Sequence, residues 1–358
     1  MKNNLIKRNI NRREFFLITG TLATTAVLYA CPKPPDEEPP PDTPVPSEAF
    51  QTMQQLWLTT PFEMSAERED ALDKIQKYAD NCLASFFKSY LTSINQSSES
   101  MERNNPVLTC YRMAFDRVLE GLKNDRVEEG TIVIWMLYNQ GFVVKTASGS
   151  FGIDIYHRWA KEFAPYLDFM CVTHNHQDHY SVELIEAMFD ANKPVLSNYL
   201  RSGSGYTFTS TTNRDYVIGK FTIKTAITDH NNTTAGRNFV TVFRIDCGSD
   251  SGNFTLLHVG DSNYNTTQYS NVEGAVNVLI PRYAPNALTE NNILGTGSGQ
   301  VSPDYVLLSH ILELSHDGVE DSRWSINMAL ERASRINHER TYVPMWGEKM
   351  VWKNGKLE

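Results

Sequence analysis

The sequence has little cysteine, no excess of basic charge and no long membrane-spanning run, and each shortage excludes a class of protein. Five cysteines among 358 residues are too few for a disulfide-stapled scaffold. A formal net charge of −9 argues against a general nucleic-acid binder, which usually carries a basic excess. The uncharged apolar stretch at residues 15–30 would reach roughly 24 Å as a helix, short of the ~30 Å hydrocarbon core of a bilayer.

The first thirty residues have the pattern of an export signal. Residues 1–14 hold five basic side chains and one acid, and the short apolar stretch follows them. A basic segment, an apolar run and a small-residue end are typical of a cleaved signal rather than of a membrane span. Arg12-Arg13, followed by Glu14-Phe15-Phe16, resembles the twin-arginine signal, whose pathway exports folded proteins. An ordinary secretory signal with two adjacent arginines is the alternative.

Residues 28–31 (LYAC) resemble a bacterial lipobox, although Tyr29 is larger than the residue usual at that position. The resemblance implies that Cys31 is diacylated and becomes the mature N-terminus. Eight of the 16 prolines fall within residues 31–47, and such a stretch forms an extended spacer of on the order of 50 Å. We therefore expect an exported bacterial lipoprotein, anchored through Cys31 to a membrane on its periplasmic or cell-surface side.

The rest of the chain divides by its hydrophobic pattern into a helical extension, residues 48–125, and a strand-rich domain, residues 126–358. With 41% hydrophobic and 21% charged residues, the chain can bury a sizeable core. Apolar residues recur at helical spacing through 66–91 and most cleanly through 107–122. The extension is expected to be either a cap over the active site or a packing or dimerisation appendage.

After residue 130, short apolar runs alternate with Gly, Asn and Asp, which predicts strands. The predicted strands are residues 131–137, 142–147, 152–156, 168–174, 193–198, 206–211, 221–228, 239–246, 254–261, 276–281, 305–310 and 341–346. Helices are expected at about 181–190 and 322–336. Strands in bulk with helices between them indicate a layered α/β or α+β sandwich.

The chemistry is concentrated in one string, Thr173-His174-Asn175-His176-Gln177-Asp178-His179, directly after an apolar strand. Imidazoles and carboxylates at this density suit borderline divalent cations such as Zn²⁺. The two-residue period of a strand delivers His174 and His176 to one side. The turn that follows can bring Asp178 and His179 to a neighbouring position, so that one loop can serve two close metal ions.

This string resembles the signature of the metallo-β-lactamase-fold hydrolase superfamily, H-x-H-x-D-H after a strand. The resemblance covers roughly residues 130–350 and implies an α+β fold, an αββα sandwich, here with an N-terminal helical extension. In that family a histidine, an aspartate and a histidine follow as further ligands at strand ends. His230, Asp261 and His310 stand in that order here, and His316 is a rival to His310.

The resemblance implies a centre of two divalent ions, with zinc expected first and manganese or iron as alternatives. The implied ligands are His174, His176 and His230 for one ion, Asp178, His179 and His310 for the other, and Asp261 as the bridge. Asp154 would lie close to the site, and Asp229, beside His230, is a candidate to orient an imidazole. The remaining histidines, His157, His258 and His338, are not expected to be ligands.

Such a centre would lower the pKa of a bound water toward ~7, and Asp178 would orient the nucleophile and exchange its proton. The expected function is metal-dependent hydrolysis of an ester, lactone, amide or phosphodiester bond in a small-molecule or lipid-like substrate. The chain most resembles the branch of L-ascorbate-6-phosphate lactonase and the N-acyl-phosphatidylethanolamine phospholipases D. Because Asp261 stands where β-lactamases usually have cysteine, and His176 where redox relatives have glutamate, neither of those activities is expected. The alternative is a non-catalytic metal- or ligand-binding lipoprotein.

Overall fold

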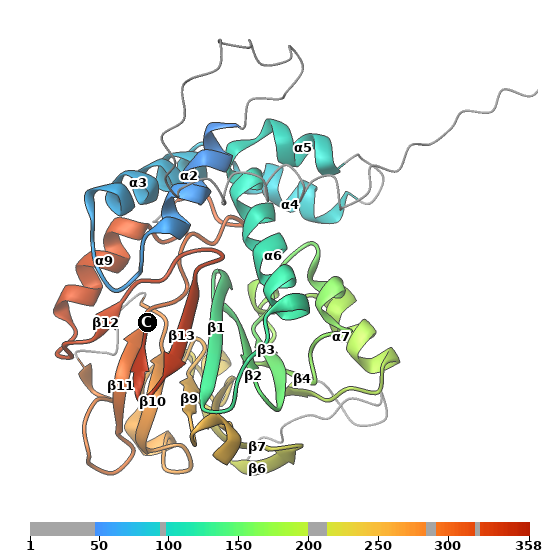
Figure 1. The fold of residues 1–358 in the computed structure, drawn as a ribbon. Coiled ribbons are helices and arrows are strands. Elements are labelled where there is room, and N and C mark those ends of the chain that lie inside the picture. Colours follow the sequence, from blue (N-terminus) through green and yellow to red (C-terminus); the bar gives the residue numbers. More distant parts are fainter. Residues whose placement is uncertain (1–46, 94–97, 200–212, 284–290, 319–322) are drawn as a thin grey trace, which may run out of the picture. The chain divides into compact units, whose positions relative to one another are not determined.

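The computed structural model describes residues 47–93, 98–199, 213–283, 291–318 and 323–358, shown in Figure 1. The predicted export signal, Cys31, nearly all of the tether and the strand predicted at 206–211 lie outside the described residues. Pro46–Glu358 form one compact unit. None of the helices within the described ranges is long and apolar enough to cross a bilayer.

Two seven-stranded sheets form the centre of this unit. The first has the order β14-β13-β1-β2-β3-β4-β5, with β1 Thr131–Tyr138, β2 Gly141–Thr146, β3 Gly149–Ile153, β4 Phe169–Val172, β5 Val195–Ser197, β13 Lys349–Lys353 and β14 Lys356–Leu357. The second has the order β12-β11-β10-β9-β8-β7-β6, with β6 Arg214–Ile218, β7 Phe221–Thr228, β8 Val240–Asp246, β9 Thr255–His258, β10 Gly274–Ile280, β11 Val301–Leu307 and β12 Thr341–Tyr342.

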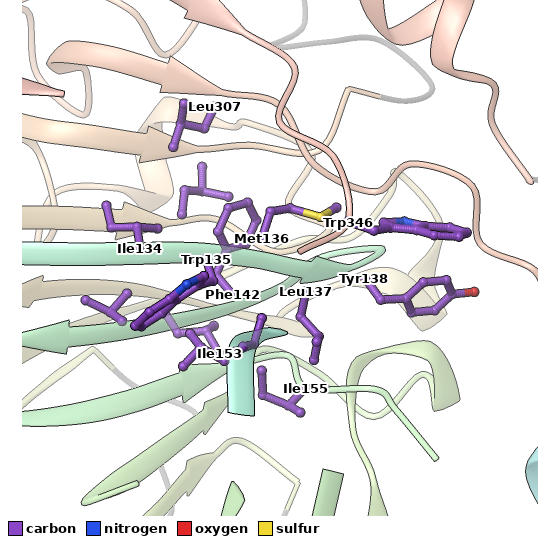
Figure 2. Close-up of a cluster of buried hydrophobic side chains, with 14 of the residues drawn as sticks. Ile134, Trp135, Met136, Leu137, Tyr138, Phe142, Ile153, Ile155, Leu307 and Trp346 are labelled. Carbon is purple, nitrogen blue, oxygen red and sulfur yellow. The ribbon is translucent and has the colours of Figure 1, made fainter. Parts of the chain in front are cut away.

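The sheets pack face to face through buried side chains. Phe221 of the second sheet contacts the rings of Phe151 and Phe169 in the first sheet. Strand β1 is buried along nearly its whole length, as expected for a strand covered on both faces. Figure 2 shows Ile134 and Met136 on the side of β1 that faces Leu307 of the second sheet.

The opposite face of β1 carries the helices. Trp135 lies against Gly121 of helix α6, Pro106–Asn124, where an added Cβ would meet the indole at 2.5 Å. Asn105 caps the N-terminus of this helix, because its side chain accepts hydrogen bonds from the N–H groups of Val107 and Leu108, and Pro106 is the first helical residue. The helix predicted over 107–122 is thereby confirmed.

The other α-helices lie around the two sheets (Figure 1). Within the described ranges they are α2 Glu48–Leu58, α3 Ala66–Asp80, α4 Ala84–Thr92, α5 Ser98–Asn104, α7 Val182–Asp190 and α9 Ile326–Arg335. Helix α7 contacts β5 at the edge of the first sheet, and α9 contacts β12 at the edge of the second. A mixed α+β fold of two central sheets with helices outside them confirms the predicted fold class.

The helical extension packs into the same core as the sheets. Arg68 of α3 forms a buried ion pair with Glu348, in which Nη2 lies 2.9 Å from Oε2, and also donates to the Val343 carbonyl at 3.0 Å. The Trp57 indole N–H of α2 donates to the Trp346 carbonyl at 3.0 Å. These contacts join the first helices to the C-terminal segment, which favours the packing alternative for the extension.

Two features differ from the sequence-based expectations. Strand β6 and the hairpin β13–β14 were not predicted, because β6 is a largely exposed edge strand and β13 buries only alternate residues between charged ends. The Cys82 and Cys110 thiols are buried and are not joined in a disulfide.

Candidate metal centre

Strand ends from both sheets converge at one edge of the unit. In the first sheet, β3 and β4 are parallel, and Asp154 and His174 follow their carboxyl ends. In the second sheet, β9, β10 and β11 are parallel; Asp261 follows β9 and His310 follows β11. His230 follows the end of β7. Parallel strands place their carboxyl ends at the same edge, which is where ligands bind in sheets of this kind.

The first group of candidate ligands is His174, His176, His230 and Asp261, whose ligating atoms all lie within 4.8 Å of one another. His174 and Asp261 are buried, His230 is partly buried and His176 is exposed. Nε2 of His230 lies 3.2 Å from Oδ2 of Asp261. The group therefore has a closed side formed by the strand ends and an open side at His176.

The second group is Asp178, His179 and His310, within the same 4.8 Å limit. Asp178 and His179 belong to a single 3₁₀ turn, Gln177–His179, so the local chain direction changes directly after His176. Nε2 of His310 lies 3.5 Å from Oδ2 of Asp178 and 3.6 Å from Oδ2 of Asp261. Asp261 thus faces both groups, which is the position expected for a bridging carboxylate.

A buried carboxylate fixes the orientation of the second group. Asp154 is fully buried and accepts from the Thr173 N–H at 2.8 Å and the Thr173 hydroxyl at 2.7 Å. Nδ1 of His179 lies 2.9 Å from Oδ2 of Asp154. A carboxylate can only accept here, so the proton lies on Nδ1 and the Nε2 lone pair faces the centre. The position expected for Asp154, close to the site, is thus what the structure shows.

Two residues of the β1–β2 turn brace the carboxylates and were not identified from the sequence. The side-chain amide of Asn139 donates to Oδ2 of Asp178 at 3.1 Å, and the backbone carbonyl of Asn139 accepts the His310 N–H at 2.9 Å. The Gln140 amide donates to Oδ1 of Asp261 at 2.7 Å. They lie 39 and 121 positions from their carboxylate partners, so no local pattern indicates them. Arg282 was likewise missed; its Nη1 lies 3.3 Å from Oδ2 of Asp261.

Two residues of the site have an unfavourable backbone conformation. Asp154 has φ 50° and His310 has φ 64°, in the left-handed region that residues with a Cβ seldom adopt. Such conformations cost of order 1–3 kcal/mol each and persist where the surrounding structure enforces them. The surrounding fold therefore enforces an unfavourable φ at two candidate site residues, and this φ sets the direction in which each side chain points.

The electrostatics of the site suit a cation. Burial lowers the pKa of His174 well below its ordinary value, so its imidazole is neutral. Burial alone would raise the pKa of Asp178 and Asp261, but the neighbouring cationic groups outweigh it and hold both pKa values well below the usual range. His179 is also buried, which lowers its pKa, yet Asp178 and Asp154 raise that pKa well above normal. His174 and the two carboxylates therefore already have the protonation states that metal binding needs, whereas the raised pKa of His179 means that a metal ion must displace a proton from its imidazole.

Unsatisfied nitrogen atoms test whether a metal fits. Within the described part of the chain, the Nε2 atoms of His174, His179 and His230 are buried without a hydrogen-bond partner. Buried polar atoms are nearly always paired, so several orphans in one cluster need an explanation. A set of nitrogen and carboxylate donors at this spacing fits divalent ions of the zinc type. Coordination by these seven side chains stays a prediction.

The other candidate residues lie apart from this cluster. His316 has Nδ1 2.5 Å from Oε2 of the buried Glu313, so the structure brings His310 rather than its rival into the centre. Asp229 accepts the Asn238 N–H at 2.8 Å and braces its loop instead of orienting an imidazole. The histidines not expected to be ligands bond backbone carbonyls: His157 that of Tyr111, His258 that of Gln140 and His338 that of Pro303.

Comparisons with known proteins found similarity to solved structures. No protein-family model and no curated protein matches the sequence. The metallo-β-lactamase-fold protein YhfI from Bacillus subtilis is 17% identical, with a TM-score of 0.43 over 63% of this chain and 100% of its own. Igni18, a metallo hydrolase from the archaeon Ignicoccus hospitalis, is 15% identical, with a TM-score of 0.46 over 62% of this chain and 99% of its own.

A solved structure of different activity is similar to the same degree. CmlA, a diiron β-hydroxylase from Streptomyces venezuelae, is 13% identical, with a TM-score of 0.44 over 63% of this chain and 54% of its own. At such identities a likeness concerns the fold alone, because one fold carries many activities. The function must therefore be argued from the geometry of the site.

Proposed function

We propose that this protein is a metal-dependent hydrolase that cleaves an ester, lactone, amide or phosphodiester bond. The observation that carries the proposal is the convergence of five imidazoles and two carboxylates in two groups that both face Asp261. Structural metal sites are closed by four protein ligands, whereas catalytic sites keep an open position. Here His176 is exposed and His230 is partly exposed, so the centre is reached from solvent.

Bound divalent ions supply two things: an acidified water as nucleophile near neutral pH, and polarisation of the oxygen at the scissile bond. The chain's own residues handle the protons. The Asp178 side chain is 14% exposed against 5% for Asp261, so Asp178 is the site carboxylate that a water reaches more easily. Its low pKa keeps it ionised at neutral pH. Asp178 therefore accepts the proton of the attacking water and returns it to the leaving group.

Zinc is the ion that this donor set supports best, since imidazole nitrogens and carboxylate oxygens are its common ligands. Manganese prefers more oxygen donors. The Cys31 lipobox and the proline-rich spacer support the further proposal that the enzyme is exported and held at a membrane surface. The motif's likeness to lactonases and phospholipases D supports a small-molecule or lipid-like substrate.

Metal analysis combined with turnover tests the proposal. The purified protein should hold about two equivalents of transition metal and hydrolyse at least one of p-nitrophenyl acetate, a γ-lactone, an anilide and bis(p-nitrophenyl) phosphate. His176→Ala should lose turnover together with metal, whereas His338→Ala, whose imidazole bonds the Pro303 carbonyl away from the cluster, should keep both. Metal retained with no turnover on any of these substrates would identify a non-catalytic binding protein instead.

A further inference from the structure

The middle strand of the parallel triplet delivers an arginine to the metal centre. Strands β9, β10 and β11 are neighbours in the sheet, and past their carboxyl ends stand Asp261, Arg282 and His310. The Arg282 backbone bridges to Ser309, directly before His310, and its carbonyl accepts the Tyr264 hydroxyl. The guanidinium is therefore placed between two candidate ligands by a fixed backbone.

The guanidinium contacts of Arg282 leave part of its donor capacity unused. Nη1 lies 3.3 Å from Oδ2 of Asp261, and Nη2 donates to the His230 carbonyl at 3.2 Å. Within the described residues its Nε has no hydrogen-bond partner, and the residue is only 9% exposed. The contact with the His230 backbone places the group on the side of the first ligand group, where the centre is open at His176.

The charge balance around Arg282 calls for an anion. A guanidinium is always charged, and taking it out of water is costly unless an opposite charge compensates it. Asp261 is the carboxylate in contact with it, and in a loaded centre that carboxylate is shared with the ions. Two divalent ions bring four positive charges and Arg282 a fifth, against the three carboxylates Asp154, Asp178 and Asp261. The excess positive charge is balanced when the substrate itself carries an oxyanion.

We infer that Arg282 is an anion-binding residue of this centre and that the substrate is a phosphate ester. The inference rests on the proposed function and narrows its substrate class. A guanidinium presents parallel N–H donors that match two phosphate oxygens, which is why arginine recognises such groups better than lysine. Arg282 holds the phosphoryl oxygens on the His230 side, and neutral esters and amides lack a partner for it.

Binding of inorganic phosphate tests the inference without turnover. Isothermal titration of the zinc-loaded, full-length protein is compared among wild type, Arg282→Gln, Arg282→Lys and Arg244→Gln, with zinc content measured for each. Arg244 is the matched control, because its guanidinium also combines backbone carbonyl acceptors with a nearby aspartate at the opposite end of β10. It donates to the carbonyls of Glu273 and Ala275, and its Nε lies 3.7 Å from Oδ1 of Asp246. Arg282→Gln should weaken phosphate binding on the order of 10–100-fold and Arg282→Lys by roughly 3–10-fold, with Arg244→Gln within twofold of wild type.

The outcomes separate the two proposals. An affinity for phosphate within twofold of wild type in either zinc-loaded Arg282 variant overturns the role of Arg282. If Arg282→Gln fails to hold zinc, the phosphate affinity of zinc-loaded Arg282→Lys, which keeps the charge, tests the role of Arg282. Turnover of esters by a wild type whose Arg282 variants bind phosphate normally would leave the hydrolase standing and remove this inference. If phosphate binding depends on Arg282 but the protein hydrolyses none of the substrates, Arg282 is an anion-binding residue and the proposed hydrolase activity is wrong.

Discussion

Replacing Asp154 by asparagine tests how the metal centre keeps its shape. The Asp154 carboxylate is fully buried and accepts three hydrogen bonds, two from Thr173 and one from Nδ1 of His179. The last bond fixes the tautomer of His179, because a proton on Nδ1 leaves the Nε2 lone pair for a metal. The substitution changes one oxygen to an NH₂ group and leaves the shape of the side chain unchanged.

An amide cannot reproduce this set of bonds. With its NH₂ group toward His179, Nδ1 must accept, so the ring proton moves to Nε2 and blocks the lone pair. With the amide flipped, the NH₂ group faces the Thr173 N–H, donor against donor. Loss of such a supporting contact typically weakens metal binding 10–100-fold, or about 1.4–2.7 kcal/mol. The loss should fall on the second group, Asp178, His179 and His310, and spare the first.

Zinc titration in competition with a chromophoric chelator resolves two binding steps, one for each zinc ion. Asp154→Asn should retain about one tightly bound equivalent after dialysis, where wild type retains about two. Asp229→Asn is the matched control, since it makes the same exchange beside His230 but loses only an acceptor for the Asn238 N–H; it should stay within threefold of wild type at both steps. Equal affinities in Asp154→Asn and wild type, or equal losses at both steps, would refute the reasoning.

Three further predictions follow from other parts of the chain. Burial lowers the pKa of His157 well below 6.5, so the unfolded chain takes up a proton that the folded one excludes; this contribution to stability is complete above pH ~6.5 and falls by about 1.4 kcal/mol per pH unit below it. Urea unfolding between pH 8 and 5 should therefore show a shallower decline for His157→Gln than for wild type, and parallel curves would contradict this. Arg68→Ala leaves the buried Glu348 carboxylate unpaired and should cost about 3–5 kcal/mol in the same assay at pH 8, whereas a loss below 1 kcal/mol would show that the extension is not integral to the core. Cys31→Ala should move the protein from the membrane fraction to the soluble one; a protein that stays membrane-bound would disprove the lipid anchor.

Much of the centre could be predicted from the sequence because its ligands are presented by local structure. His174, His176, Asp178 and His179 all lie in the short segment that follows β4, so their closeness in the sequence and the 3₁₀ turn at Gln177–His179 bring them together. The amphipathic pattern of α6 likewise specified a helix before any partner was known. The predicted fold class followed from strands in bulk separated by turn residues and helices.

The amino-acid pattern alone therefore specified the kind of chemistry and the segments that carry it. The tertiary structure decided which distant groups meet, because pairing between strands and packing between layers set those distances. His310 rather than His316 reaches the centre since the buried Glu313 binds the latter. Arg282 stands beside Asp261 because β10 lies between β9 and β11. The contact of Arg282 with Asp261 has no local signature, since it depends on the register of a whole sheet.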